Sequence, residues 1–133
     1  MKNMKNLIVV FLYIITGFGC VAQSNIPSNA KEILMSKTWI IDGVEDHTYK
    51  IIFTNTKMIT YSNEIIVGED EYYLVDDLSQ CGPNKFIQSN VGNSNSGKYF
   101  VAKGFCLEFT NISNNKLEFK NLKSNSNMSA TPE

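Results

Sequence analysis

His47 is the only histidine of the sequence, and histidine is the residue type best suited to acid–base chemistry near neutral pH. It follows Glu45 and Asp46, so this segment offers one imidazole and two carboxylates to a metal ion or a proton transfer. A zinc site needs at least three protein ligands of suitable type, and the chain has no second histidine or spare thiolate. We therefore expect residues 43–47 to form a solvated turn, and we expect no metal ion or cofactor.

Carboxylates and hydroxyl groups elsewhere give no stronger signal for catalysis. The acidic segments 69–71 and 76–77 contain oxygen ligands that calcium prefers, but they lack the alternating spacing of a calcium loop. A serine nucleophile needs a neighbouring base, and only His47 could provide one. The sequence also lacks a glycine-rich phosphate loop. We therefore predict that the protein is not an enzyme.

The cysteines predict one covalent cross-link. The chain has three cysteines, and Cys20 lies at the end of an apolar N-terminal segment, which leaves Cys81 and Cys106 as a pair. Such a pair forms a disulfide in an oxidising compartment. Closing a loop of about 25 residues would stabilise the fold by roughly 3 kcal/mol, a large share of the stability of a small domain.

The N-terminal segment has the three parts of an export signal. Two lysines precede an apolar run at residues 7–15, and small residues follow it. This run is too short to anchor the protein by spanning a bilayer. The sequence therefore predicts an exported protein that is periplasmic or secreted.

Two cleavage routes remain open at the end of this signal. Residues 1–22 form a signal peptide if ordinary signal peptidase cuts before Gln23. Residues 1–19 are removed instead if Cys20 is lipidated and becomes the new N-terminus of a lipoprotein. The second route would tether the protein to a membrane, which is the only membrane contact expected.

The charge of the chain argues against nucleic-acid binding. The formal net charge is -1, and all the basic residues are lysine, without a single arginine. Removal of the signal leaves a mildly acidic protein. Nucleic-acid binding normally needs a basic face, with arginine as the preferred reader of phosphates and bases. We therefore expect no nucleic-acid partner.

The remaining sequence predicts an all-β domain. Residues 23–35 form a linker and a short helical turn, residues 36–122 a β-barrel domain, and residues 123–133 a disordered tail. Because strands follow one another through short turns, we expect a small antiparallel up-and-down barrel of about eight short strands. Closure removes exposed strand edges. The expected strands are 38–42, 49–54, 58–61, 65–67, 72–75, 98–102, 105–110 and 116–120, with residues 86–87 as a further brief candidate.

The start of the first strand resembles that of small bacterial lipocalin-like domains. In these families, a short helical turn leads into a strand with a tryptophan near its start, as in Ser36-Lys37-Thr38-Trp39. Lys37 departs from the family pattern, which usually has glycine there. The resemblance implies that Trp39 is structural and plugs the closed end of the barrel.

A second resemblance involves Ser96-Gly97-Lys98-Tyr99 and the following Lys103-Gly104. These segments resemble part of the periplasmic C-type lysozyme inhibitors, which are small exported β-barrels. The spacing is one residue short, because Tyr99 comes two residues after Gly97 and not three. The resemblance implies a protein partner in the cell envelope.

Two functional hypotheses follow. The first is an exported lipocalin-like envelope protein that binds a small apolar ligand at the barrel mouth. An eight-stranded barrel holds little beyond its own side chains, so we expect at most a small cavity there. The second hypothesis is a protein-binding inhibitor or interaction module that acts through the long connection 76–97. For the first hypothesis, the candidate ligand-binding residues are aromatics expected on the inner face: Tyr49, Phe53, Tyr61, Tyr73 and Tyr99.

Overall fold

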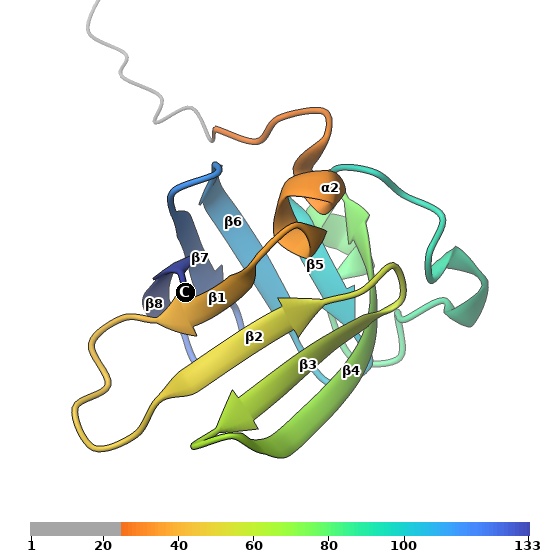
Figure 1. The fold of residues 1–133 in the computed structure, drawn as a ribbon. Helices are drawn as coiled ribbons and strands as arrows, with labels where there is room; N and C mark the ends of the chain where they lie inside the picture. The colour runs from red at the N-terminus through yellow and green to blue at the C-terminus, as the bar shows by residue number, and fades with distance from the viewer. Residues whose placement is uncertain (1–24) are drawn as a thin grey trace, which may run out of the picture.

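Antiparallel strands that pair in sequence order close into a barrel in the computed structural model (Figure 1). The structure describes residues 25–133. The predicted all-β up-and-down barrel of eight strands is confirmed. The strands are β1 (Thr38–Ile41), β2 (Tyr49–Phe53), β3 (Lys57–Ser62), β4 (Ile65–Val75), β5 (Tyr99–Ala102), β6 (Cys106–Ile112), β7 (Leu117–Asn121) and β8 (Ser126–Pro132). The helical segments are α2 (Ala30–Met35) and the short 3-10 turns η2 (Leu78–Gln80) and η3 (Gln88–Asn90).

The predicted signal peptide, the choice between the two cleavage routes and the lipidation of Cys20 all concern residues outside the described part of the chain. The short helix α2 occupies the residues predicted as a helical turn. The side chain of Asn29 does not cap it; instead the Asn29 carbonyl accepts a hydrogen bond from the Ile33 amide at 3.2 Å.

The prediction of a disordered tail at 123–133 is wrong. Strand β8 lies between β7 and β1 and closes the barrel. Its inward positions hold Met128, Ala130 and Pro132, and of these only Ala130 is fully buried, so the apolar alternation is weak and the residues between are small and polar. Backbone pairing on both sides holds the strand: Ala130 pairs with Leu117 of β7 and Pro132 with Trp39 of β1.

Strand β4 also differs from the prediction, because residues 65–75 form one long strand. We expected two strands separated by a turn at 68–71. Glu69 and Glu71 instead lie on the solvent face of the strand, where Glu69 forms an ion pair of 3.5 Å with Lys57 of β3. An antiparallel sheet tolerates such polar positions on its solvent face. Asp70 between them faces inward, opposite Met58. Residues 86–87, the brief strand candidate, belong to no strand.

The inner core lies inside the barrel, where side chains of α2 pack together with those of the strands. Figure 1 shows α2 across one end of the barrel. Trp39 is fully buried, and its Nε1 donates a hydrogen bond of 2.9 Å to the Leu34 carbonyl of α2. Aromatic rings from neighbouring strands stack within the same cluster, with the Tyr72 and Phe100 centroids 4.7 Å apart. We use the name inner core for the buried cluster that includes Leu34, Trp39, Phe53, Tyr72, Phe100, Leu107, Phe109 and Phe119.

Strands β4, β5 and β6 bury their outward face as well. Tyr73, Val101 and Cys106 point away from the inner core and form a second buried group under the connection 76–97. All four residues of β5 are consequently buried. We call this group the outer cluster; it consists of Tyr73, Val101 and Cys106 with the partly buried Val75, Cys81, Phe86, Val91 and Leu122.

Candidate functional site

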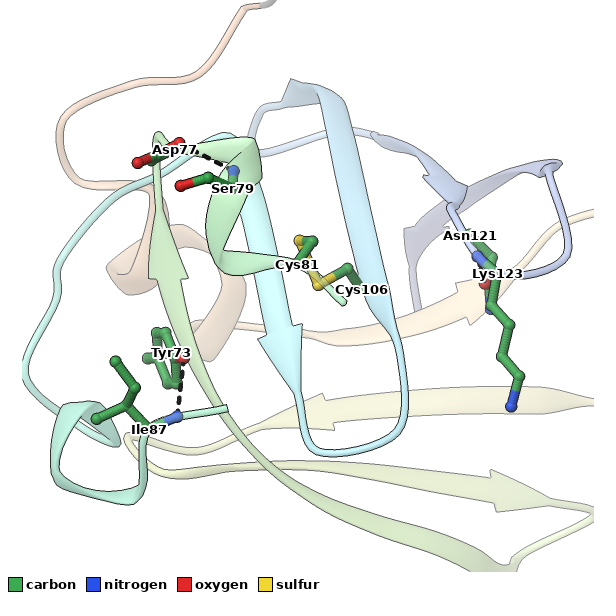
Figure 2. The surroundings of a disulfide bond; sticks show 8 residues. All are labelled: Tyr73, Asp77, Ser79, Cys81, Ile87, Cys106, Asn121 and Lys123. Atoms are coloured by element: carbon green, nitrogen blue, oxygen red, sulfur yellow. Dashed lines mark hydrogen bonds between the residues drawn. A yellow bond between two sulfur atoms is a disulfide. The ribbon is translucent and has the colours of Figure 1, made fainter. Parts of the chain in front are cut away.

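A disulfide fixes the connection between β4 and β5 to the barrel wall. Cys81 is bonded to Cys106 at the start of β6, with a Cα–Cα distance of 5.9 Å (Figure 2). The predicted disulfide is thereby confirmed. Such a bond fits an exported protein, because oxidising compartments preserve disulfides. It holds the first half of the connection 76–97 against the outer face of the sheet.

Side-chain contacts of Tyr73 fix the middle of the same connection. Its ring packs against Phe86, with the centroids 5.4 Å apart. Its hydroxyl oxygen accepts a hydrogen bond of 3.1 Å from the Ile87 amide, as Figure 2 shows. At the start of the connection, the Asp77 carboxylate accepts a hydrogen bond from the Ser79 amide, which lowers the pKa of Asp77. The connection is therefore an ordered element.

The last part of the connection returns to the barrel beside α2. The Ser94 hydroxyl oxygen accepts a hydrogen bond of 2.9 Å from the Leu74 amide. Ser96 donates a hydrogen bond of 2.7 Å to the Pro27 carbonyl. Gly97 passes so close to β4 that an added Cβ atom would lie 2.4 Å from the Val75 nitrogen. Ser96 and Gly97, which carry the lysozyme-inhibitor resemblance, thus hold the chain against β4 and the N-terminal segment.

An open cleft of about 710 Å³ lies beside the disulfide, at the end of the barrel opposite α2. Three separate segments form it: the chain around η2, the β5–β6 turn and the β7–β8 turn. Leu78, Phe105 and Leu122 give it an apolar surface, and Phe105 also stacks on Phe100 of the inner core. The complete lining is Leu78, Cys81, Gly82, Pro83, Asn84, Ala102, Lys103, Gly104, Phe105, Cys106, Leu122 and Lys123. We call it the disulfide cleft.

A second cleft of about 490 Å³ lies over β6, β7 and β8. Its polar groups already have partners within the fold. Asp42 accepts hydrogen bonds from Ser129 at 2.8 Å and Thr131 at 3.1 Å, and Lys116 forms an ion pair of 3.2 Å with Glu118. This cleft therefore offers a ligand fewer free polar groups than the disulfide cleft.

The structure separates the five aromatic residues that we proposed as ligand contacts. Phe53 lies in the inner core, and Tyr49 lies on the same face of β2. Tyr61 pairs with Lys50 on the outer face, Tyr73 belongs to the outer cluster, and Tyr99 lies on the outer face of β5. The expectation that all five face inward is wrong, because the register of β3, β4 and β5 turns three of them outward. None of the five lines either cleft.

Buried titratable groups lie near the inner core. Burial raises the pKa of Tyr72, whose hydroxyl donates a hydrogen bond of 2.8 Å to the Thr54 carbonyl. Burial lowers the pKa of Lys31, whose ammonium group lies 6.0 Å from the centroid of the Tyr72 ring. Asp70 shares the inward face of β4 with Tyr72, and burial raises its pKa. None of these groups lines either cleft.

The side chain of His47 lies next to an aromatic ring, with its centroid stacked 6.0 Å from that of Tyr49. Within residues 25–133, no group of three or more His, Cys, Asp or Glu side chains is arranged to hold a metal ion. The same part of the chain contains no helix long and apolar enough to cross a membrane.

Sequence comparison adds no functional evidence: no protein-family model, curated protein or solved structure matches this chain.

Sequence reasoning did not find the disulfide cleft, for a physical reason. Its apolar residues are single leucines and one phenylalanine in otherwise polar turns, so no periodic pattern marks them. The cysteine pairing was the one available signal for the cleft. A disulfide between residues 81 and 106 brings the chain around η2 beside the start of β6. Lys103 and Lys123 gave no signal, because single lysines in turns are ordinary surface residues.

Proposed function

We propose that the protein is an exported, non-enzymatic, lipocalin-like binding protein of the cell envelope, with the disulfide cleft as its ligand site. The ligand is a small, mostly apolar molecule. The observation that carries this proposal is the size and lining of the cleft: about 710 Å³, with Leu78, Phe105 and Leu122 on its surface. Ligand sites are typically clefts of about 300–1,000 Å³, lined mainly by apolar side chains with a few polar groups.

The packing of the barrel favours a ligand site in the disulfide cleft, because side chains already fill the barrel interior. Rings of the inner core occupy the space beneath α2, and Phe53, Tyr72 and Phe100 pack edge and face against one another. The cleft, by contrast, has walls that are already fixed. The disulfide and the outer cluster hold its η2 side, so ligand binding would cost little ordering of the chain.

Export and the lipocalin-like assignment rest on separate features. The basic and apolar N-terminal segment and the disulfide both suit an oxidising compartment outside the cytoplasm. The helical turn that leads into Trp39, and the hydrogen bond of this residue to α2, support the lipocalin-like assignment.

The test is binding of an environment-sensitive apolar fluorophore to the mature protein and to two variants. Gly104 lines the cleft, and an added Cβ atom there would meet nothing within 4 Å, so this position accepts a side chain, and Gly104→Trp is designed to obstruct the cleft. Asn114→Trp, in the exposed β6–β7 turn, is the matched control. We expect G104W to lose binding at least tenfold, with an unchanged melting temperature, and N114W to bind like the wild type. Equal binding by all three proteins would refute the site.

One observation favours a second candidate, a protein-interaction module. Leu78 and Ile87 are 54% and 47% exposed on a connection that is itself held rigidly. Apolar side chains presented in this way are typical of recognition surfaces. A photo-crosslinking side chain at Ile87, used in the cell envelope of the host, should then give one defined protein adduct. The same group at Lys120 on β7 is the control and should give none. Identical adduct patterns from both positions would exclude this candidate.

A further inference from the structure

The disulfide cleft carries an unbalanced charge. Lys103 and Lys123 line it, and none of its lining residues is acidic. Within residues 25–133, neither lysine forms an ion pair; the lysines that do are Lys50, Lys57, Lys98 and Lys116. The protein as a whole has a formal net charge of -1. The positive charge of the cleft is therefore a local property, opposite in sign to that of the whole chain.

This charge restricts the ligands that suit the cleft. An uncharged apolar ligand would leave the two exposed ammonium groups hydrated and without a partner, so they would add nothing to its binding. A ligand with a carboxylate at one end would pair with them, and the attraction would be stronger beside the apolar surface than in bulk water. A cationic amphiphile would be repelled.

We propose that the ligand is an amphiphilic anion, an unbranched alkyl carboxylate of the free fatty-acid type. The alkyl chain lies on Leu78, Phe105 and Leu122, and the carboxylate lies at the rim beside Lys103 and Lys123. Each methylene group that leaves water strengthens binding about fourfold, so the chain supplies most of the affinity and the head group the selectivity. This assignment rests on the proposed function, since it requires the cleft to be the binding site.

The experiment is calorimetric titration of the mature protein with dodecanoate, dodecanol and dodecyltrimethylammonium, each below its solubility limit or micelle concentration. The three probes share a twelve-carbon skeleton, and their head groups are anionic, uncharged and cationic. We expect dodecanoate to bind about tenfold more tightly than dodecanol, since two partly exposed ion pairs each contribute a few-fold. The cationic probe should bind most weakly.

Two double variants test whether Lys103 and Lys123 cause the preference for dodecanoate over dodecanol. K103Q/K123Q removes the charges of the cleft and should make dodecanoate and dodecanol bind equally. K37Q/K120Q removes two lysines outside the cleft that also lack ion pairs, and it should keep the tenfold preference. The cleft-filling variant G104W should lose binding of both uncharged and anionic probes.

The outcomes separate the two proposals. Equal affinity of the wild type for dodecanoate and dodecanol overturns the anion assignment and leaves the apolar site intact. A preference for dodecanoate that survives in K103Q/K123Q also overturns it. If no probe binds, or if G104W binds all of them normally, the proposed function itself fails.

Discussion

The inner core and the outer cluster use the same three strands in different ways. In β4, β5 and β6, residues such as Tyr72, Phe100 and Leu107 face the barrel interior, while their chain neighbours Tyr73, Val101 and Cys106 face outward. The inner core is covered on all sides by strands and by α2. The outer cluster is covered only by a connection of irregular structure. The inner core thus depends on regular backbone pairing, whereas the outer cluster depends on side chains and one covalent bond.

The two regions also differ in how completely their polar groups are paired. The polar atoms of the inner core have partners, as the hydrogen bonds of Trp39 to Leu34 and of Tyr72 to Thr54 show. In the connection that covers the outer cluster, the Oε1 atom of Gln80 is buried without a hydrogen-bond partner among the described residues. An unsatisfied buried acceptor costs stability. We therefore expect the connection to open at a lower free energy than the barrel.

The largest expected effect is in the inner core. Phe100→Ala removes a ring that is fully buried and stacked on Tyr72, so the free energy of unfolding should fall by about 3–5 kcal/mol. Phe86 is one of the partly buried residues of the outer cluster, so Phe86→Ala should lower the free energy of unfolding by less than half as much. Urea denaturation monitored by circular dichroism measures both. Equal costs would contradict the ranking of the two regions.

Removal of the disulfide should have the next largest effect. The variant C81A/C106A loses a cross-link across 25 residues, and its unfolding free energy should fall by about 3 kcal/mol. Amide hydrogen exchange should rise across residues 76–97 and stay slow in β1, β2 and β3, because those strands do not contact the outer cluster. An increase of exchange throughout the barrel would show that the two regions unfold together.

Two neighbouring tyrosines, one in each region, allow the loss of a single hydrogen bond to be compared, with a smaller expected effect. Tyr73→Phe removes the hydroxyl that accepts a hydrogen bond from the Ile87 amide. This change should lower the free energy of unfolding by about 1 kcal/mol and speed amide hydrogen exchange near residue 87. Tyr72→Phe removes the hydrogen bond to the Thr54 carbonyl, at a similar cost, but its effect should appear in global unfolding. If Tyr73→Phe leaves exchange in the connection unchanged, this hydrogen bond does not hold the connection.

The smallest effect concerns Asp70 and depends on pH. Burial raises the pKa of this carboxyl above its ordinary value of 3.8, so the folded state favours the protonated form. The charged form therefore destabilises the fold at neutral pH, and this penalty disappears as the pH falls below that raised pKa. Asp70→Asn should be slightly more stable than the wild type at pH 7, with no gain near pH 3. A constant difference across this range of pH would argue against burial as the cause.

The inner core was predictable, and the outer cluster was largely not. Alternation in β2, β6 and β7 marks the inward residues directly, because one face of each strand is buried and the other is not. Around Tyr73 and Val101 the strands read as continuous apolar runs, which indicate burial on both faces. Within a continuous run the pattern does not tell the two faces apart, so it could not show that Tyr73 and Tyr99 lie on the outer face.

The other differences have separate causes. The strand count of eight was predicted, but β4 was divided in two and β8 was missed, so the agreement in number hides two errors. Strand β8 has only a short and weak apolar alternation at Met128, Ala130 and Pro132, and its pairing with β7 and β1 reveals it as a strand. Three segments that are distant in sequence form the disulfide cleft, and no local sequence pattern predicts that they lie together.

The position of β8 has a consequence for how the chain acquires its shape during synthesis. Because the barrel closes only when β8 pairs with both β7 and β1, closure must wait until the ribosome has released residues 126–132. Until then β1 and β7 each expose a free edge that can pair with another chain. A premature stop codon after β7 would leave both edges permanently unpaired, so such a product should aggregate or be degraded.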